Sequence, residues 1–520
     1  MSAVPLPGAA PAAAPSPSPP PAAPPVPAVF GLRLATGLAG VLLAVLVSGL
    51  NENITKVALA DIRGAMGIAR DDASWLVALY AAASVSAMAF APWCSVTFSL
   101  RRLTATAIIV CMAAGLLCPF APNLSMLMFL RVVQGAAGGA LPPMLMTVAL
   151  RFLPPNIKLY GLGGYALSAT FGPSLGTPLA AFWTEYLGWQ WAFWQIVPGS
   201  IVALLMVSWG LPQDPLRLDR FRQFDWRGLL LGLPAISMLV VGLLQGERLA
   251  WFASPLICVL LGGGAVLLVL FFINEWSHPL PFFKLQLLSR RNLSHALLTL
   301  GGVLFVLLAV ILIPSSYLAQ VHAYRPLQTA PVMLMVALPQ LIALPLVAAL
   351  CNLRAVDCRW VLAIGLALLA VSCVLGARMS PDWIRTHFYL LQAVQIFAQP
   401  MAVIPLLLLA TTGLAPQDGP FASAWFNTIK GMSAVVATGV LDALITRRNH
   451  FHSTVLSDRL GNLPAGVDMA GLDPGLAQRM HAQVITLTSS DLYLTVAAIA
   501  LAMIVIIPIL PTRVYPPRAA

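Results

Sequence analysis

Charged residues are scarce in this chain of 520 residues. Together, aspartate, glutamate, lysine and arginine make up 9% of it, whereas 59% is hydrophobic and the mean hydropathy is +0.87. Ordinary soluble domains contain about 25% charged residues. The shortage of charge therefore excludes a soluble multidomain protein and predicts an all-α polytopic membrane protein.

The sequence also lacks the motifs of metal and redox chemistry. None of its seven cysteines has CxxC spacing, no HExxH occurs, and no paired aspartates lie within the apolar segments. Three histidines (His450, His452 and His481) share one polar stretch, but their spacing fits no compact metal site. We therefore expect no cofactor, no metal and no enzymatic activity. The 29 lysines and arginines form no dense run, which argues against nucleic acid as a partner.

The first 29 residues contain eleven prolines and no charged side chain. A segment of this composition has almost nothing to bury, so residues 1–29 are predicted to form a disordered cytoplasmic tail. The folded part is expected to begin at residue 30, and 512–520 is predicted to be a second short tail.

Fourteen apolar segments follow, each long enough to cross a bilayer of about 30 Å. They span approximately 34–60, 73–92, 103–121, 124–150, 159–183, 191–211, 228–246, 253–274, 294–319, 328–351, 359–378, 385–411, 420–446 and 490–511. A polar stretch at 447–489 is predicted to be a long outer loop.

The loops between these segments differ in basic residues. With both termini placed in the cytoplasm, the cytoplasmic loops and tails contain sixteen lysines and arginines and the short outer loops contain six. Because positively charged loops stay on the cytoplasmic side, the sequence predicts that both termini are cytoplasmic.

The segment 124–150 has polar residues where hydrocarbon is expected. Arg131 and Gln134 lie inside it, and Gly135 and Gly139 form a small-xxx-small face that allows a neighbouring helix to approach closely. An arginine in a membrane is costly and normally faces a protein interior or a cavity. The pattern indicates a transporter core, although an arginine that only braces a helix bundle is the alternative.

Two other spans contain unusual residues. The sequence ATFGPSLGTP at 169–178 places Gly172, Pro173 and Gly176 in the fifth span, where they predict either a hinge or static close packing. In span twelve, three glutamines lie on one helical face, and they either line a cavity or hydrogen-bond between helices. These glutamines are Gln392, Gln395 and Gln399.

Several motifs resemble those of one transporter family. FLRVVQGAAGG (129–139) is similar to motif B of the major facilitator superfamily, and GPSLGTP resembles its antiporter motif C. LNENITKVALADI (50–62), WQWAFWQIVPG (189–199) and FNTIKGMSAVVATG (426–439) resemble sequences of fourteen-span drug:proton antiporters of the EmrB/QacA type. The resemblance runs in the right order from about 34 to 511.

This resemblance implies a fold, an activity and partners. The fold is two six-helix bundles, at 30–211 and 294–511, with two extra helices inserted within 212–293. The implied activity is export of amphipathic or toxic small molecules in exchange for protons, in the inner membrane of a bacterium. The partners are then substrate, protons and membrane lipid. The outer stretch 447–489 adds a possible periplasmic adaptor and outer-membrane channel.

The sequence departs from the family pattern at several positions. Asn51 stands at the acidic position of the first span with Glu52 beside it, and Lys56 replaces the family's asparagine. The loop between spans two and three keeps only Arg101 and Arg102 of the usual motif. The family's arginine in span thirteen is Lys430 here.

These polar residues give competing hypotheses for proton coupling. Glu52 and Arg131 are expected at similar depths, roughly 12 and 10 Å from the outer ends of their spans at 1.5 Å per residue, so Arg131 is a candidate to tune Glu52. A static pair of Glu52 and Lys56 is the alternative, and Asp442 is a third candidate for the carrier. The expected substrate cavity comprises Asn51, Lys56, Gln134, Gln392, Gln395, Gln399, Asn427 and Lys430. Proton-coupled export of a specific metabolite such as an organic acid, which Lys430 favours, is an alternative. A receptor or scaffold without transport is another.

Overall fold

The computed structural model describes residues 30–154, 157–411, 414, 418–461, 475–508 and 512–513. Within these residues the chain is helical and contains no β-strand. The predicted tail at 1–29 and residues 514–520 of the predicted tail at 512–520 lie outside the described residues.

Thirteen of the described helices are long and apolar enough to cross a membrane. A fourteenth long helix, α6, runs among them, and it is less apolar because of its glycines, serines, threonines and prolines. The prediction of an all-α polytopic fold is therefore confirmed. The long helices are α1 (Leu32–Val57), α3 (Arg70–Phe98), α4 (Leu100–Leu117), α5 (Leu124–Phe152), α6 (Lys158–Tyr186), α8 (Ile196–Gly210), α9 (Trp226–Gln245), α10 (Pro255–Ser277), α11 (Arg291–His322), α12 (Pro326–Asn352), α13 (Cys358–Gly376), α14 (Phe388–Thr411), α15 (Gly419–Gly461) and α16 (Leu476–Ile506).

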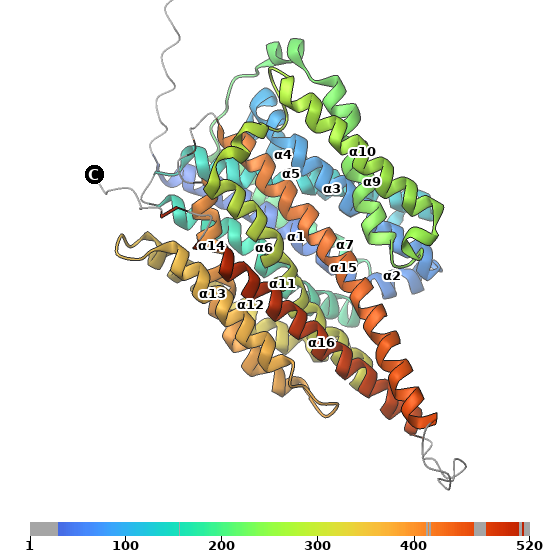
Figure 1. Cartoon of the computed structure of the whole chain (residues 1–520). Helices are drawn as coiled ribbons and strands as arrows, with labels where there is room; N and C mark the ends of the chain where they lie inside the picture. Colours follow the sequence, from blue (N-terminus) through green and yellow to red (C-terminus); the bar gives the residue numbers. More distant parts are fainter. Residues whose placement is uncertain are drawn as a thin grey trace, which may run out of the picture.

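The helices before and after the central hairpin pack as two groups. In the N-terminal half α1 packs on α5, α6 and α8, and α3 packs on α5; in the C-terminal half α11 packs on α14, α15 and α16, and α13 packs on α14 and α16. The halves meet where α6 packs on α12 and where α3 packs on α15 (Figure 1). The hairpin of α9 and α10 lies at this second seam, because α9 contacts both α3 and α15.

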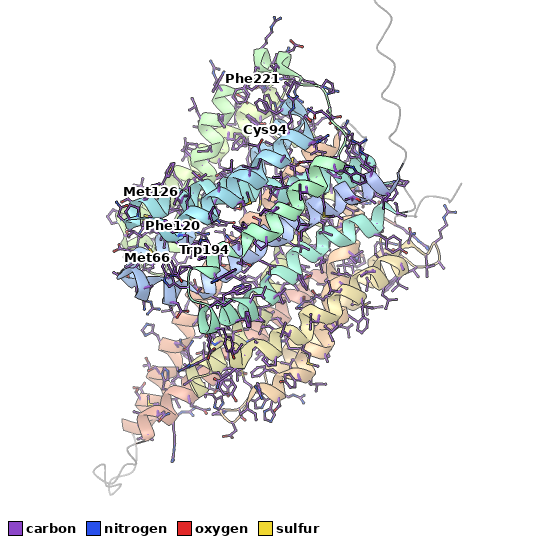
Figure 2. The ribbon with its side chains drawn as sticks, turned by 180° about the vertical axis from the view of Figure 1, so that it is seen from behind. Met66, Cys94, Phe120, Met126, Trp194 and Phe221 are labelled. Carbon is purple, nitrogen blue, oxygen red and sulfur yellow. The ribbon has the colours of Figure 1, made fainter. Side chains whose placement is uncertain are left out.

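Each end of the bundle collects a defined set of helix ends. Helix α1 begins and α16 ends at the same end, which we call the predicted cytoplasmic end. Short elements close the opposite, predicted outer end: α2 (Leu59–Met66) and α7 (Trp191–Trp194). Met66, Phe120, Met126 and Trp194 gather there (Figure 2). The rings of Phe120 and Trp194 are 5.9 Å apart, as in the aromatic belts of membrane proteins.

Glycines set the closest helix contacts. A Cβ on Gly135 or Gly139 would overlap the backbone of Tyr80 or Ser84, so α5 approaches α3 as closely as a small-xxx-small face allows. On α6, a Cβ on Gly176 would lie 2.6 Å from Cβ of Asn53 in α1. The glycine face of α6 therefore meets a helix of its own half.

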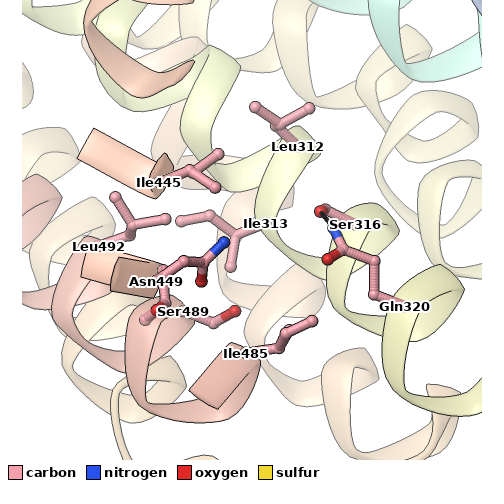
Figure 3. Close-up of a pocket in the computed structure, with 10 residues that line it drawn as sticks. Leu312, Ile313, Ser316, Gln320, Ile445, Asn449, Ile485, Ser489 and Leu492 are labelled. Carbon is pink, nitrogen blue, oxygen red and sulfur yellow. Dashed lines mark hydrogen bonds between the residues drawn. The ribbon is translucent and has the colours of Figure 1, made fainter. Parts of the chain in front are cut away.

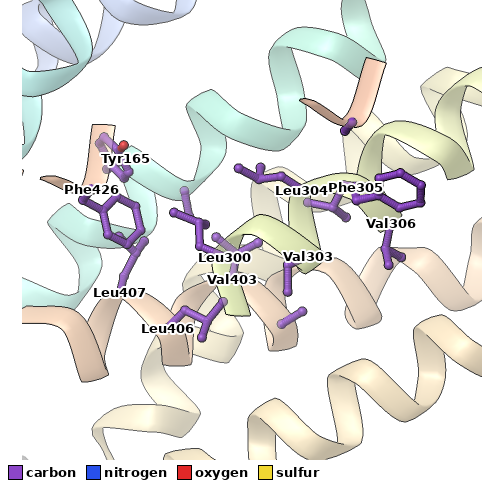
Figure 4. Close-up of a cluster of buried hydrophobic side chains, with 14 of the residues drawn as sticks. Tyr165, Leu300, Val303, Leu304, Phe305, Val306, Val403, Leu406, Leu407 and Phe426 are labelled. Atoms are coloured by element: carbon purple, nitrogen blue, oxygen red, sulfur yellow. The ribbon is translucent and has the colours of Figure 1, made fainter. Parts of the chain in front are cut away.

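The apolar core of the cross-half contact lies near the predicted cytoplasmic end. Tyr165 of α6 packs edge-on against Phe426 of α15 with ring centroids 5.8 Å apart. Leucines and valines of α11 and α14 continue this cluster into the C-terminal half (Figure 4). Packing of this kind, rather than burial from water, holds helices together in lipid.

The predicted outer loop at 447–489 differs from the structure. Helix α15 continues to Gly461 and α16 begins at Leu476, so both ends of the stretch are helical. The sequence from 440 to 460 contains neither glycine nor proline, so no residue breaks the helix where the membrane is expected to end. Residues 462–474 lie outside the described residues.

Candidate functional site

Arg131 lies inside the N-terminal half with 1% of its surface exposed. Its Nη1 donates a hydrogen bond of 2.6 Å to Oε1 of Gln134, one turn further along α5. The guanidinium group also stacks over the Tyr80 ring of α3, 4.1 Å from the centroid. A hydrogen bond and a cation–π contact offset part of the cost of a buried charge. The Gly135 contact permits this stacking, since it brings α3 and α5 together beside Arg131.

Several buried polar atoms of α1 and α5 make no hydrogen bond to protein. They are Nε of Arg131, Nε2 of Gln134 and both side-chain polar atoms of Asn51. Asn51 and Gln134 are fully buried. Buried polar groups normally bind water or another partner, so this region is suited to hold small polar molecules.

Glu52 forms an ion pair with Lys56 one turn along α1, with Oε1 and Nζ 2.6 Å apart. The side chain of Lys56 is 41% exposed and that of Glu52 is 28% exposed, so both reach an accessible space. Arg131 binds Gln134 instead of Glu52. Of the arrangements that the sequence left open, this conformation shows the Glu52–Lys56 pair.

Lys430 brings a charge from the other half to the same region. Its Nζ lies 3.4 Å from Oγ of Ser168 and 4.8 Å from the centroid of the Tyr165 ring, both on α6. The carboxylate of Glu52 interacts electrostatically with Lys56, Arg131 and Lys430. One carboxylate and three cations from α1, α5 and α15 thus lie close enough to interact, and we call them the central charge group.

Hydrogen bonds close the seam on its predicted cytoplasmic side. The Tyr165 hydroxyl donates to Oδ1 of Asn427 over 2.7 Å, and the Ser423 hydroxyl donates to the carbonyl of Pro143 over 3.0 Å. Each bond joins a helix of one half to α15 of the other. Asn427 is fully buried, so the expected cavity residue is a closing contact in this conformation.

The three glutamines of α14 are buried within the C-terminal half. Gln395 donates to Oγ of Ser372 in α13 over 2.8 Å, and Gln340 of α12 donates to Gln399 over 2.5 Å. Gln392 is 3% exposed. These bonds correspond to the alternative in which the glutamines tie helices together.

The remaining candidates lie apart from the central charge group. Asp442 of α15 interacts electrostatically with Glu247 in the turn after α9, so it faces the inserted hairpin. Arg101 donates to the backbone carbonyl of Ser208, and Arg102 lies against Gln213. Both arginines therefore hold the end of α8 and the following linker to their own half.

Gly172, Pro173 and Gly176 belong to an unbroken helix. Gly172 faces the backbone of Gly49 and Gly176 faces Asn53, so this surface packs on α1 within the N-terminal half. Residues 172–176 also have the spacing GxSxG, which in hydrolases carries the nucleophilic serine. That serine lies at a sharp turn between a strand and a helix. Ser174 instead lies within α6 and is 1% exposed.

Sequence reasoning missed four residues of this site. They are Tyr80, Tyr165, Ser168 and Ser423. Each is a mildly polar residue in an apolar span, and no spacing or motif distinguishes it from the other hydroxyl-bearing residues of the spans. Tyr165 offered a signal, because a tyrosine inside an apolar span usually needs a hydrogen-bond partner for its hydroxyl.

Comparisons with known proteins agree with this architecture. A family model described as Major Facilitator Superfamily matches residues 41–438. The chain is 23% identical over 417 residues to the multidrug export protein EmrB of Escherichia coli K12, covering 80% of this chain and 81% of that protein. It is 25% identical over 493 residues to a multidrug resistance protein B homolog of Mycobacterium tuberculosis H37Rv, covering 91% and 89%.

Among solved structures, the fold is similar to that of the human organic anion transporter MFSD10. The TM-score is 0.57 at 14% identity, covering 91% of this chain and all of that one. This likeness concerns the fold.

Proposed function

Because the chain belongs to the major facilitator superfamily, we propose that it exports amphipathic or toxic small molecules in exchange for protons by alternating access. Relatives over most of the chain are multidrug export proteins, which supports export of such molecules. Carriers of this kind bind substrate near the membrane midplane between two halves that rock against each other. The central charge group contains residues of both halves, because Lys430 belongs to α15 and the others belong to α1 and α5.

The observation that carries the proposal is the position of Glu52. It is the one carboxylate that faces Lys56, Arg131 and Lys430 in the part of the chain described here, and it is partly exposed. Nearby cations favour an ionised carboxylate and desolvation favours a neutral one. A change in the distance from Glu52 to Arg131 or Lys430 as the halves move therefore changes the proton affinity of Glu52.

The test is transport in proteoliposomes with an imposed pH gradient, comparing Glu52→Gln with Lys56→Gln. Both variants break the same ion pair, but only the first removes the ionisable carboxyl group. We expect Glu52→Gln to bind substrate and lose gradient-driven transport, whereas Lys56→Gln keeps a measurable response to the gradient.

Two outcomes contradict this role of Glu52. Wild-type transport with the same pH dependence in Glu52→Gln places the carrier elsewhere, and Asp442→Asn is then the next variant. Equal loss in both variants shows that the ion pair, and not the proton, is what transport requires.

One observation favours the export of an organic acid as the second candidate. Three cations face one carboxylate in the central charge group, so an anion is attracted there. The two candidates differ in the charge of the substrate, not in its exchange for protons. Removal of one cation by Lys430→Gln should weaken the binding of an organic acid and leave the binding of a neutral or cationic drug unchanged. Affinities of both kinds of ligand for this variant and the wild type separate the candidates.

The proposal includes a place in the cell and partners. We propose that the protein spans the inner membrane of a bacterium, with both termini in the cytoplasm. The long helices α15 and α16 extend past the predicted outer surface and are the proposed contact for a periplasmic adaptor and an outer-membrane channel.

A further inference from the structure

Two buried carboxylic acids lie at the base of the inserted hairpin. Asp225 precedes α9 and is 2% exposed, and Glu275 lies in the last turn of α10 and is 1% exposed. They are far from the central charge group along the chain and at the predicted cytoplasmic end. Buried carboxylates need a cation, hydrogen-bond donors or a proton.

Asp225 accepts more hydrogen bonds than Glu275 does. Asp225 accepts from the backbone N–H of Gly228 over 2.7 Å and from the side-chain amide of Asn274. Glu275 accepts at Oε2 from the N–H of Phe283 over 2.8 Å, while its Oε1 has no hydrogen-bond partner. Asp225 is therefore the better supplied with hydrogen-bond donors of the two.

The unpartnered oxygen of Glu275 faces Asp225. A Cβ on Gly228 would meet both Oδ2 of Asp225 and Oε1 of Glu275, the latter at 2.7 Å, so the two oxygens lie on the same side of Gly228. Two ionised carboxylates cannot share such a buried position, because each only accepts hydrogen bonds and their charges repel.

Three nearby cations have other partners. Lys284 and Arg290 of the segment 278–290 pair with Asp418 at the start of α15, and Arg220 stacks over Trp93 of α3. The charged group that acts on Glu275 is Asp225 itself. A proton is thus the simplest partner for Oε1.

We propose that Glu275 is protonated on Oε1 and that this O–H donates a hydrogen bond to Oδ2 of Asp225. The bond holds Glu275 where it accepts from Phe283, so the segment 278–290 stays packed against the hairpin. When the proton is lost, the two carboxylates repel. Glu275 then moves away from Asp225, and the N–H of Phe283 loses its acceptor.

The segment 278–290 connects the hairpin to α15. The ring of Phe283 packs edge-on against Trp425 with centroids 4.9 Å apart, and the Trp425 indole donates to the carbonyl of Lys284 over 3.2 Å. Trp425 stands between Ser423 and Asn427, which close the seam on the predicted cytoplasmic side. Protonation of the Asp225–Glu275 pair therefore affects α15, the helix that closes the seam. At alkaline pH the contacts of Phe283 and Lys284 with Trp425 of α15 weaken.

Hydrogen exchange of the segment 278–290 tests this proposal without any transport measurement. Protection factors, which correct for the intrinsic effect of pH, are compared from mildly acidic to alkaline pH in the purified full chain. We expect the protection of this segment in the wild type to fall about tenfold as pH rises, as for the loss of one hydrogen bond of about 1.4 kcal/mol. In Glu275→Gln it should stay constant, because the amide still accepts from Phe283 and donates to Asp225.

Control variants make each outcome decisive. Asp219→Asn, an exposed acid just before α9, should behave as wild type. Asp225→Asn should also remove the pH dependence, because its side-chain amide donates to Glu275. This variant replaces Glu275→Gln in the test if Glu275→Gln does not fold. The same pH dependence in wild type, Glu275→Gln and Asp225→Asn overturns the proposal. So does wild-type protection that responds to Na⁺ or Ca²⁺ instead of pH, since the pair then holds a metal cation. Because no substrate is used, failure of the proposed transport activity leaves this result intact.

Discussion

The hydroxyl of Tyr165 on α6 donates a hydrogen bond of 2.7 Å to Asn427 on α15, and this bond joins the two halves of the bundle. Tyr165 also lies below Lys430, with its ring 4.8 Å from Nζ. One aromatic side chain therefore contacts both a closing residue and a cation of the central charge group. Movement of the halves must break the first contact and alter the second.

Tyr165→Phe should favour opening of the predicted cytoplasmic side. The variant keeps the ring and leaves the buried Oδ1 of Asn427 without its donor, which costs about 1–3 kcal/mol in the closed state. That cost shifts the balance toward the open state by roughly five-fold or more. Labelling of Met146→Cys, beside Asn427, with an impermeant thiol reagent measures the shift in a cysteine-free background.

Tyr160→Phe is the control for this variant, because it removes a hydroxyl from a half-exposed residue of the same helix. It should label at the rate of the cysteine-free parent. Equal labelling in Tyr165→Phe and the parent would show that this bond does not hold the seam.

Gly139→Ala should destabilise the protein, whereas Gly163→Ala should not. A Cβ at Gly139 overlaps the backbone of Ser84, but a Cβ at Gly163 meets Cβ of Ala348 at 3.9 Å, an ordinary contact. Overpacking of a tight contact costs about 1–3 kcal/mol. Thermal unfolding of the two purified variants should differ by several degrees, and equal midpoints would contradict the close approach of α3 and α5.

Much of the helical fold could be predicted from the sequence, because a bilayer sets the length of each apolar segment. The thirteen apolar helices and α6 correspond to the fourteen expected segments. The helical continuation of α15 could not be predicted from hydropathy, since residues 447–461 are polar. This helical continuation is supported by side-chain contacts between α15 and α16, in which Arg448 and His452 pair with Asp491.

The candidate site was only partly predictable. Arg131, Glu52 and Lys430 are conspicuous because charge is rare in these spans, and in the structure Glu52 interacts electrostatically with both cations. Which partner each charge takes depends on rotations of helices that sequence spacing does not set. For this reason the sequence alone could not show that Arg131 binds Gln134 and Tyr80 in this conformation. The spacing of Gly172 and Gly176 likewise does not show which helix they contact, which in the structure is α1.

The orientation of the bundle is a further prediction. Arginines and lysines concentrate at the end where α1 begins, so we expect this end in the cytoplasm. A cysteine at position 470 (Ala470→Cys) in a cysteine-free background should then react with an impermeant reagent added to intact cells. Reaction of this cysteine only after the membrane is permeabilised would reverse the arrangement.

The extensions of α15 and α16 are clamped by one acid. Asp491 of α16 lies 2.8 Å from Nε2 of His452 and 3.6 Å from Nη1 of Arg448, both on α15. Its side chain is 31% exposed, so each pair is worth about 0.2–1 kcal/mol. The clamp stands between the membrane-spanning helices and the part proposed to contact an adaptor.

Asp491→Asn should therefore separate adaptor-dependent efflux from transport itself. The amide keeps a hydrogen bond to His452 but loses the charge that attracts Arg448, so the outer ends of α15 and α16 separate more easily. The residues of the central charge group are unchanged. We expect wild-type transport in proteoliposomes, where no adaptor is present, and reduced efflux together with weaker adaptor co-purification in cells. Asp61→Asn, an exposed acid on α2 at the same end, is the matched control and should leave both measurements unchanged. Reduced transport by Asp491→Asn in proteoliposomes would show that the clamp supports the transport cycle, and normal co-purification would place the adaptor contact on another surface.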